Sequence, residues 1–240
     1  MKKLLPVLLL LATATAFAAG DDAAAVLKKY DAVMAPDVAE MEASMTVTRD
    51  DGSQRTYVMR ILKKNDDKSR ISFDKPASMS GQEILRVGDN AWIYLPDIKR
   101  ATNMSNKESF QGGDFSNSDM LRPNLSQDYE PKFIESGDHE ALALELTSKS
   151  KETAYQTIKL WVRKKDNLPV KAQYFATSGK LLRSTLYSDY KEFQPGFTRP
   201  AKLVMTNETV KNRQSELLLL KLKTGGVIPD GRFALNDLGK

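Results

Sequence analysis

In the stretch from Val38 to Lys64, "VAEMEASMTVTRDDGSQRTYVMRILKK", apolar and polar residues alternate over much of the length. In its first half Met41 and Met45 fall on an apolar face, and Glu and Thr residues fall on the other. A period of two is typical of a β-strand with one buried face. Asp51-Gly52 then predicts the tight turn of a hairpin. The stretch therefore predicts two antiparallel strands.

The same pattern continues along the chain. The second half of the stretch puts Met59 and Ile61 on one face, "EALALELTSK" does so with Leu144, and "YQTIKLWVRKKD" does so with Leu160. Turn residues separate these runs, and no helices lie between them of the kind that parallel pairing requires. We predict a mainly β fold in which a single curled antiparallel sheet, a meander of about ten strands, has one apolar face.

An apolar face of that size needs a cover, because soluble monomers rarely expose large apolar patches. "DDAAAVLKKYDAVMAP" has helical periodicity, with Asp21 or Asp22 as N-cap and Pro36 as a stop signal. This N-terminal helix is one predicted cover of the sheet.

The second predicted cover is the segment "SFQGGDFSNSDM", residues 109–120. Ser116 and Asp119 have the spacing of a capping box, which predicts a short helix. We expect a lid helix over a half-barrel, with Phe110, Phe115 and Met120 pointing inward. The adjacent glycines at 112 and 113 predict a hinge with access to positive φ. An exposed loop or a structural clasp between strands are the alternatives.

The N-terminus, "MKKLLPVLLLLATATAFAAG", has a basic start, an apolar run and a small-residue cleavage site. This composition is typical of a secretory signal peptide. We predict a signal peptide at residues 1–18 and one domain at residues 19–240, located in the periplasm. The sequence has no cysteine, so this domain has no disulfide.

The charge pattern gives little support for a nucleic-acid partner. Removal of Lys2 and Lys3 with the signal peptide lowers the net charge from +5 to +3. The remaining basic residues alternate with acidic ones, which is typical of solvated strand edges and turns.

The chain also lacks the usual signatures of an enzyme. The Gly-Gly-Asp loop has no P-loop lysine, and one histidine, His139, without any cysteine makes a zinc site implausible. We predict no catalytic residues, no metal and no cofactor.

The run "PASMSGQEILRVGDNAWIYLPDIKR" followed by "SFQGGDFSNSDM" resembles the LolA-like outer-membrane lipoprotein-sorting family. It is similar to a branch with a W-x-Y-L-P-x-x-K-R strand and an S-F-x-G-x-D-F-S loop. The resemblance implies a half-barrel closed by helices around a hydrophobic cavity that takes acyl chains. It also implies a membrane-protein donor or acceptor, with an RND-type transporter as one candidate, and we expect a monomer.

The apolar strand faces and the resemblance coincide at the methionines. Methionine suits a surface that repacks around variable chains, although it also fills gaps in ordinary cores. The residues expected to line the cavity and lid are Met41, Met45, Met59, Ile61, Leu144, Leu160, Phe110, Phe115 and Met120.

The sequence leaves two functions open. One is a periplasmic carrier that binds the acyl chains of a lipid or lipoprotein and hands them on. The other is an envelope-sensing protein-interaction module of the same fold. A further expectation concerns Trp92 and Tyr94, which alternate with Ile93 and Leu95 and so predict a strand covered on both faces.

Overall fold

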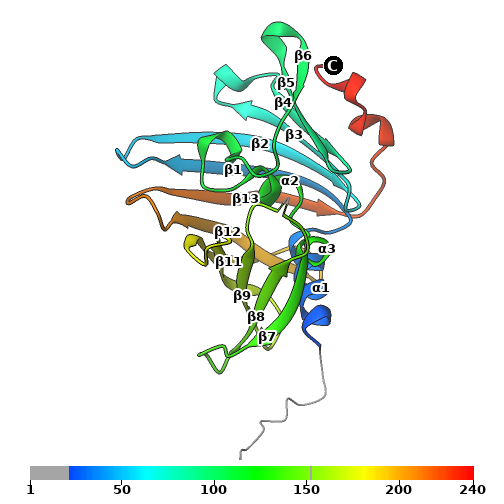
Figure 1. The fold of residues 1–240 in the computed structure, drawn as a ribbon. Coiled ribbons are helices and arrows are strands. Elements are labelled where there is room, and N and C mark those ends of the chain that lie inside the picture. Colours follow the sequence, from blue (N-terminus) through cyan, green and yellow to red (C-terminus); the bar gives the residue numbers. More distant parts are fainter. Residues whose placement is uncertain (1–21, 152) are drawn as a thin grey trace, which may run out of the picture.

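The computed structural model describes residues 22–151 and 153–240. The predicted signal peptide, residues 1–18, lies outside the described residues. Within them the chain forms one strongly curved antiparallel sheet whose concave side holds short helices (Figure 1). The predicted class, a mainly β half-barrel, is confirmed.

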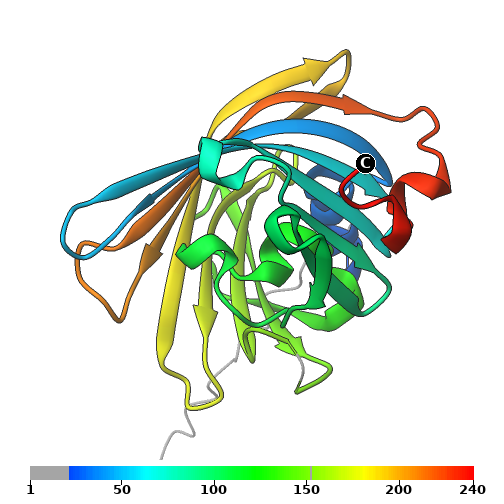
Figure 2. The same ribbon diagram turned by 90° about the horizontal axis from the view of Figure 1, so that it is seen from above.

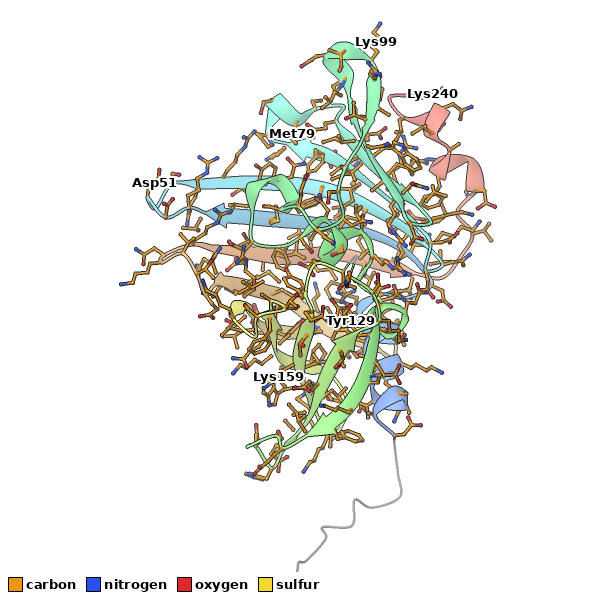
Figure 3. All side chains as sticks on the ribbon, viewed as in Figure 1. Asp51, Met79, Lys99, Tyr129, Lys159 and Lys240 are labelled. Carbon is orange, nitrogen blue, oxygen red and sulfur yellow. The ribbon has the colours of Figure 1, made fainter. Side chains whose placement is uncertain are left out.

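The strands follow each other along the chain as antiparallel neighbours. They are β1 (Val38–Thr48), β2 (Gln54–Lys64), β3 (Lys68–Lys75), β4 (Glu83–Val87), β5 (Asn90–Leu95), β6 (Arg100–Asn103), β7 (Tyr129–Ile134), β8 (Ala141–Ser148), β9 (Thr157–Arg163), β10 (Pro169–Phe175), β11 (Leu181–Gln194), β12 (Phe197–Asn207) and β13 (Gln214–Thr224). The predicted hairpin at Asp51-Gly52 is the β1–β2 turn, and Asp51 lies at its outer tip (Figure 3).

The order of strands differs from the single meander that local patterns predict. In the part of the chain that the structure describes, the 13-stranded sheet has the order β6-β5-β4-β3-β2-β1-β13-β12-β11-β10-β9-β8-β7. Two meanders therefore meet at the centre, where β1 pairs with β13 and Met45 lies opposite Leu217. As a result the two edges of the sheet, β6 and β7, are consecutive in the chain.

The chain between the two edges, residues 104–128, is called here the crossing segment. It contains α2 (Asn117–Leu121) and α3 (Leu125–Asp128) and passes through the hollow of the curved sheet (Figure 2). The predicted capping box is present in α2, because Ser116 Oγ accepts from the Asp119 amide and Asp119 accepts from the Ser116 amide.

The N-terminal helix α1 (Ala23–Met34) also forms as predicted. Asp22 is its N-cap and accepts a hydrogen bond from the Ala25 amide at 2.6 Å. The helix buries Val26, Leu27 and Tyr30 against the concave side of the sheet. Together α1 and the crossing segment cover the apolar face.

The convex side of β3–β5 has its own cover, the C-terminal tail of residues 225–240 (Figure 2). Phe233 and Leu238 in the tail are buried with Leu85, and Trp92 and Tyr94 pack on them. Ile93 packs against the main core on the opposite face. The prediction that this strand is covered on both faces is confirmed.

Candidate functional site: a cavity under the crossing segment

A cavity of about 650 Å³ lies on the concave side of the sheet, over β9–β13. Its size is within the range of small-molecule sites in proteins. Its walls come from α1, the crossing segment, the loop before β9 and the inward faces of the strands; they include Tyr30, Met34, Met104, Phe115, Asp119, Met120, Leu125, Tyr129, Tyr155, Ile158, Tyr174, Tyr187, Leu203, Met205 and Leu217. Tyr129, at the start of β7, marks the cavity near the middle of the molecule (Figure 3).

The other half of the curved sheet is filled by the protein itself. Phe110 of the crossing segment is fully buried and stacks on Phe73 of β3, with 6.1 Å between ring centroids. Tyr57 of β2 donates a hydrogen bond to the carbonyl of Gln111 at 3.1 Å. Phe110 thus occupies the space over β2 and β3, whereas the space over β9–β13 stays open.

The structure divides the predicted ligand-binding residues into three groups. Phe115 and Met120 line the cavity. Met41 and Ile61 line a second pocket of about 470 Å³ whose other lining residues include Glu40, Arg60 and Lys221. The remaining residues are fully buried in the main core and do not line the cavity: Met45, Met59, Leu144, Leu160 and Phe110.

The two glycines of the crossing segment have different roles. Gly112 has φ +73°, the left-handed region that favours glycine. Gly113 has φ −81°, and a Cβ there would lie 3.0 Å from both Ser215 Oγ and Val47 Cγ2. Close packing therefore favours glycine at 113, and the expectation of positive φ at both glycines is wrong for this residue.

Asp114, the next residue, anchors the crossing segment to the second half of the sheet. Its side chain is fully buried and accepts hydrogen bonds from Asn207 at 2.8 Å and from Ser215 at 3.1 Å. The guanidinium groups of Arg213 and Arg183 lie 3.2 and 3.6 Å from the same carboxylate. This part of the segment has the contacts of a clasp.

At the α2 end of the cavity, Asp119 accepts a hydrogen bond from the Tyr155 hydroxyl at 2.9 Å. Burial raises the pKa of Asp119 above its usual value, although hydrogen bonds from Ser116 and Tyr155 oppose this shift. Burial, followed by the nearby Asp119 carboxylate, raises the pKa of Tyr155 as well. Tyr155 is thus a neutral donor at physiological pH.

At the α1 end, the hydroxyls of Tyr30 and Tyr187 are 3.3 Å apart, and burial raises the pKa of both. Arg199 of β12 lies beside them and is only 6% exposed. Its Nη1 donates to the carbonyl of Met34, the last residue of α1, at 3.2 Å. A positive charge is therefore buried next to this end of the cavity.

The polar residues of the cavity were not found from sequence. Tyr174 and Tyr187 do lie on inward strand faces, so a period of two that counted tyrosine as inward-facing would have selected them. Their convergence with Tyr30, from the distant N-terminal helix, depends on the tertiary fold.

The described residues contain neither a cluster of metal ligands nor a membrane-spanning helix. No group of three potential ligands from His, Asp and Glu there could hold a metal ion. Within residues 22–151 and 153–240, no helix has the length and apolar character needed to cross a bilayer.

A protein-family model and several solved structures are similar to this chain. A family model described as that of an uncharacterized protein matches residues 65–240. The crystal structure of a LolA superfamily protein from Nitrosomonas europaea aligns with a TM-score of 0.81 at 26% identity, over 90% of this chain and 99% of that one. The chain belongs to the family of this model, and its fold is LolA-like.

Two further solved structures share the fold of this LolA-like protein. A domain from Vibrio parahaemolyticus described as an outer membrane lipoprotein-sorting protein aligns with a TM-score of 0.76 at 21% identity, over 89% of this chain and 98% of that one. A DUF1329 family protein from Desulfovibrio piger aligns with a TM-score of 0.80 at 23% identity, over 90% and 97%. Among proteins with curated descriptions, none matches the chain.

Proposed function

We propose that this LolA-like protein is a periplasmic carrier that binds acyl chains in the cavity under the crossing segment and hands them to a membrane-bound partner. The observation that carries the proposal is the cavity itself, about 650 Å³ on the concave side of the sheet. Its volume is within the range of ligand pockets in proteins, and this supports an occupant.

The walls of the cavity support an apolar occupant of variable shape. Met34, Met104, Met120 and Met205 line it. Thioether side chains are flexible and polarizable, so they adapt to different apolar partners. Phe115 adds an aromatic surface from the crossing segment.

The cellular setting of the proposal comes from the N-terminal sequence and the family. The basic start and apolar run of residues 1–18 favour export, and the fold is that of proteins associated with lipoprotein sorting. The donor or acceptor is a membrane protein, with an RND-type transporter as one candidate. The carrier acts without chemistry of its own, as a monomer and without a cofactor.

Native mass spectrometry of the protein purified from its own envelope tests the proposal. A carrier retains a lipid or an acylated peptide, and Met120→Asp should lose most of that mass, because it replaces an apolar part of the wall with a carboxylate that an alkyl chain would have to desolvate. Val210→Asp, at a partly exposed turn residue, is the matched control and keeps the lipid. A wild-type protein that carries only a partner peptide supports the protein-interaction module instead.

A further inference from the structure

The geometry points to an anionic head group on the cargo: we infer that Arg199, with the hydroxyls of Tyr30 and Tyr187, binds the carboxylate or phosphate of a single-chain amphiphile whose alkyl chain fills the cavity. This inference rests on the proposed function, and it names the class of ligand that the cavity takes.

The first support is the unusual setting of Arg199. The residue is 6% exposed, and among the described residues no carboxylate pairs with it. A buried charge without a partner of opposite sign is costly, and proteins normally pair such charges. In residues 22–151 and 153–240, no side chain supplies this counter-charge.

The hydrogen bonds of Arg199 are also incomplete. A guanidinium group has five N–H donors, and Nη1 reaches the Met34 carbonyl while Nε is buried without any partner. The carbonyl at the end of α1 favours a cation through the helix dipole. The hydrogen bond to the Met34 carbonyl uses one donor of the guanidinium. The other donors can bind two oxygens of an anion.

The neighbouring tyrosines complete the set of donors. Tyr30 and Tyr187 line the cavity, and Arg199 lies beside them. Both hydroxyls are protonated at neutral pH, since burial raises each pKa. A carboxylate or phosphate at this position would accept hydrogen bonds from them in addition to the ion pair.

The strand that carries Arg199 also gives the direction of the alkyl chain. Arg199, Leu203 and Met205 share the buried face of β12, and Leu203 and Met205 line the cavity. Six residues of strand span about 20 Å, so the face leads from the cation to the apolar wall. The acidic residues that line the cavity lie at its other end, Asp119 on α2, Asp128 on α3 and Asp89 in the β4–β5 turn, where an anion would be repelled.

The test compares three ligands that share one chain: hexadecanoate, hexadecyl phosphate and hexadecanol. The lipid-free mature protein is mixed with equal amounts of an anion and the alcohol, and native mass spectrometry gives the ratio bound. We expect the wild type to prefer one or both anions by about tenfold or more, as for a hydrogen bond to a charged group. If hexadecanoate competes better than hexadecyl phosphate, the cargo has a carboxylate head group; the opposite order indicates a phosphate.

Variants assign the preference to Arg199. R199M should bind the alcohol as before and lose the preference for anions, and its thermal stability should be equal or higher because a buried cation is replaced by an apolar chain of similar length. R199K should keep part of the preference. K202M changes a cation on the other face of β12 and should leave the ratio unchanged.

Several results would overturn the inference. A wild type that binds anion and alcohol equally leaves the carrier proposal intact but removes the head-group site, and so does an R199M that still prefers anions. Binding of none of the three ligands refutes the carrier proposal and this inference together. If R199M does not fold, R199Q, which can still donate to the Met34 carbonyl, serves for the same comparison.

Discussion

The buried carboxylate of Asp114 accepts a hydrogen bond from Asn207 Nδ2 at 2.8 Å, and it thereby joins the crossing segment to the end of β12. The two residues are 93 positions apart in the sequence. Arg213, in the loop that leads into β13, lies 3.2 Å from the same carboxylate. The cover of the cavity is thus tied at this point to the half of the sheet that forms its wall.

Asp114→Ala should lower the free energy of unfolding by about 2–4 kcal/mol, because it leaves buried donors without an acceptor. Urea denaturation followed by circular dichroism measures the change. Asp97→Ala, at an exposed carboxylate before β6, is the control and should stay within about 0.5 kcal/mol of the wild type. A loss as small as that of the control would show that Asp114 is not an anchor.

Hydrogen exchange should divide the crossing segment into two parts. Residues 110–116 should exchange slowly with or without lipid. The Asp114 amide donates to the buried Ser215 hydroxyl, and the Phe110 amide donates to the Phe115 carbonyl. Residues 117–128, in two short helices above the cavity, should be protected only when lipid is bound. Equal slow exchange over both parts would exclude a lid.

Charge insertions should distinguish the cavity from the packed core. Leu144→Asp places a carboxylate among fully buried side chains and should abolish the cooperative thermal transition. Leu203→Asp faces the cavity, where water can hydrate the charge, and should fold but lose lipid in native mass spectrometry. Loss of folding in both variants would contradict an open cavity at Leu203.

Asp119 should make stability decrease as pH rises. Its pKa is raised in the folded state, chiefly by burial, so between the unfolded value of about 3.8 and the folded value the native state binds more protons. Stability from this group is complete below pH 3.8 and is lost as pH rises through the folded pKa. Relative to wild type, Asp119→Asn should therefore gain stability as pH increases, measured by urea denaturation from pH 4 to pH 7; a constant difference would refute the shift.

The C-terminal tail should stabilise the convex side without affecting the cavity. Phe233→Ala removes a side chain that is 4% exposed and should cost about 3–5 kcal/mol. Leu235→Ala, two residues further on and 47% exposed, should change stability by less than about 0.5 kcal/mol. Lipid loading should be the same in both folded variants, and a selective loss in Phe233→Ala would connect the tail to the cavity.

Local patterns predicted much of the secondary structure correctly. The period of two places Tyr57, Met59 and Ile61 on a buried face, and Asp22 and Ser116 cap the helices that their spacing indicates. These features depend on residues close in sequence, since strand pleat, tight turns and helix caps are local. The same patterns could not say which inward side chains meet protein and which meet open space.

The sequence by itself determined a β-rich chain with one apolar face, a helix at its start and a capped helix at residues 117–121. Only the tertiary structure decided that β1 pairs with β13, so that the edges of the sheet are adjacent in the chain and residues 104–128 pass between them. It also decided that Phe110 fills one half of the hollow while Tyr30, Tyr187 and Arg199 surround the end of the other. These outcomes depend on contacts between residues far apart in the sequence; Tyr30 and Tyr187, for example, are 157 positions apart. Such contacts are set by the packing of the whole sheet, which has no periodic signal in the sequence.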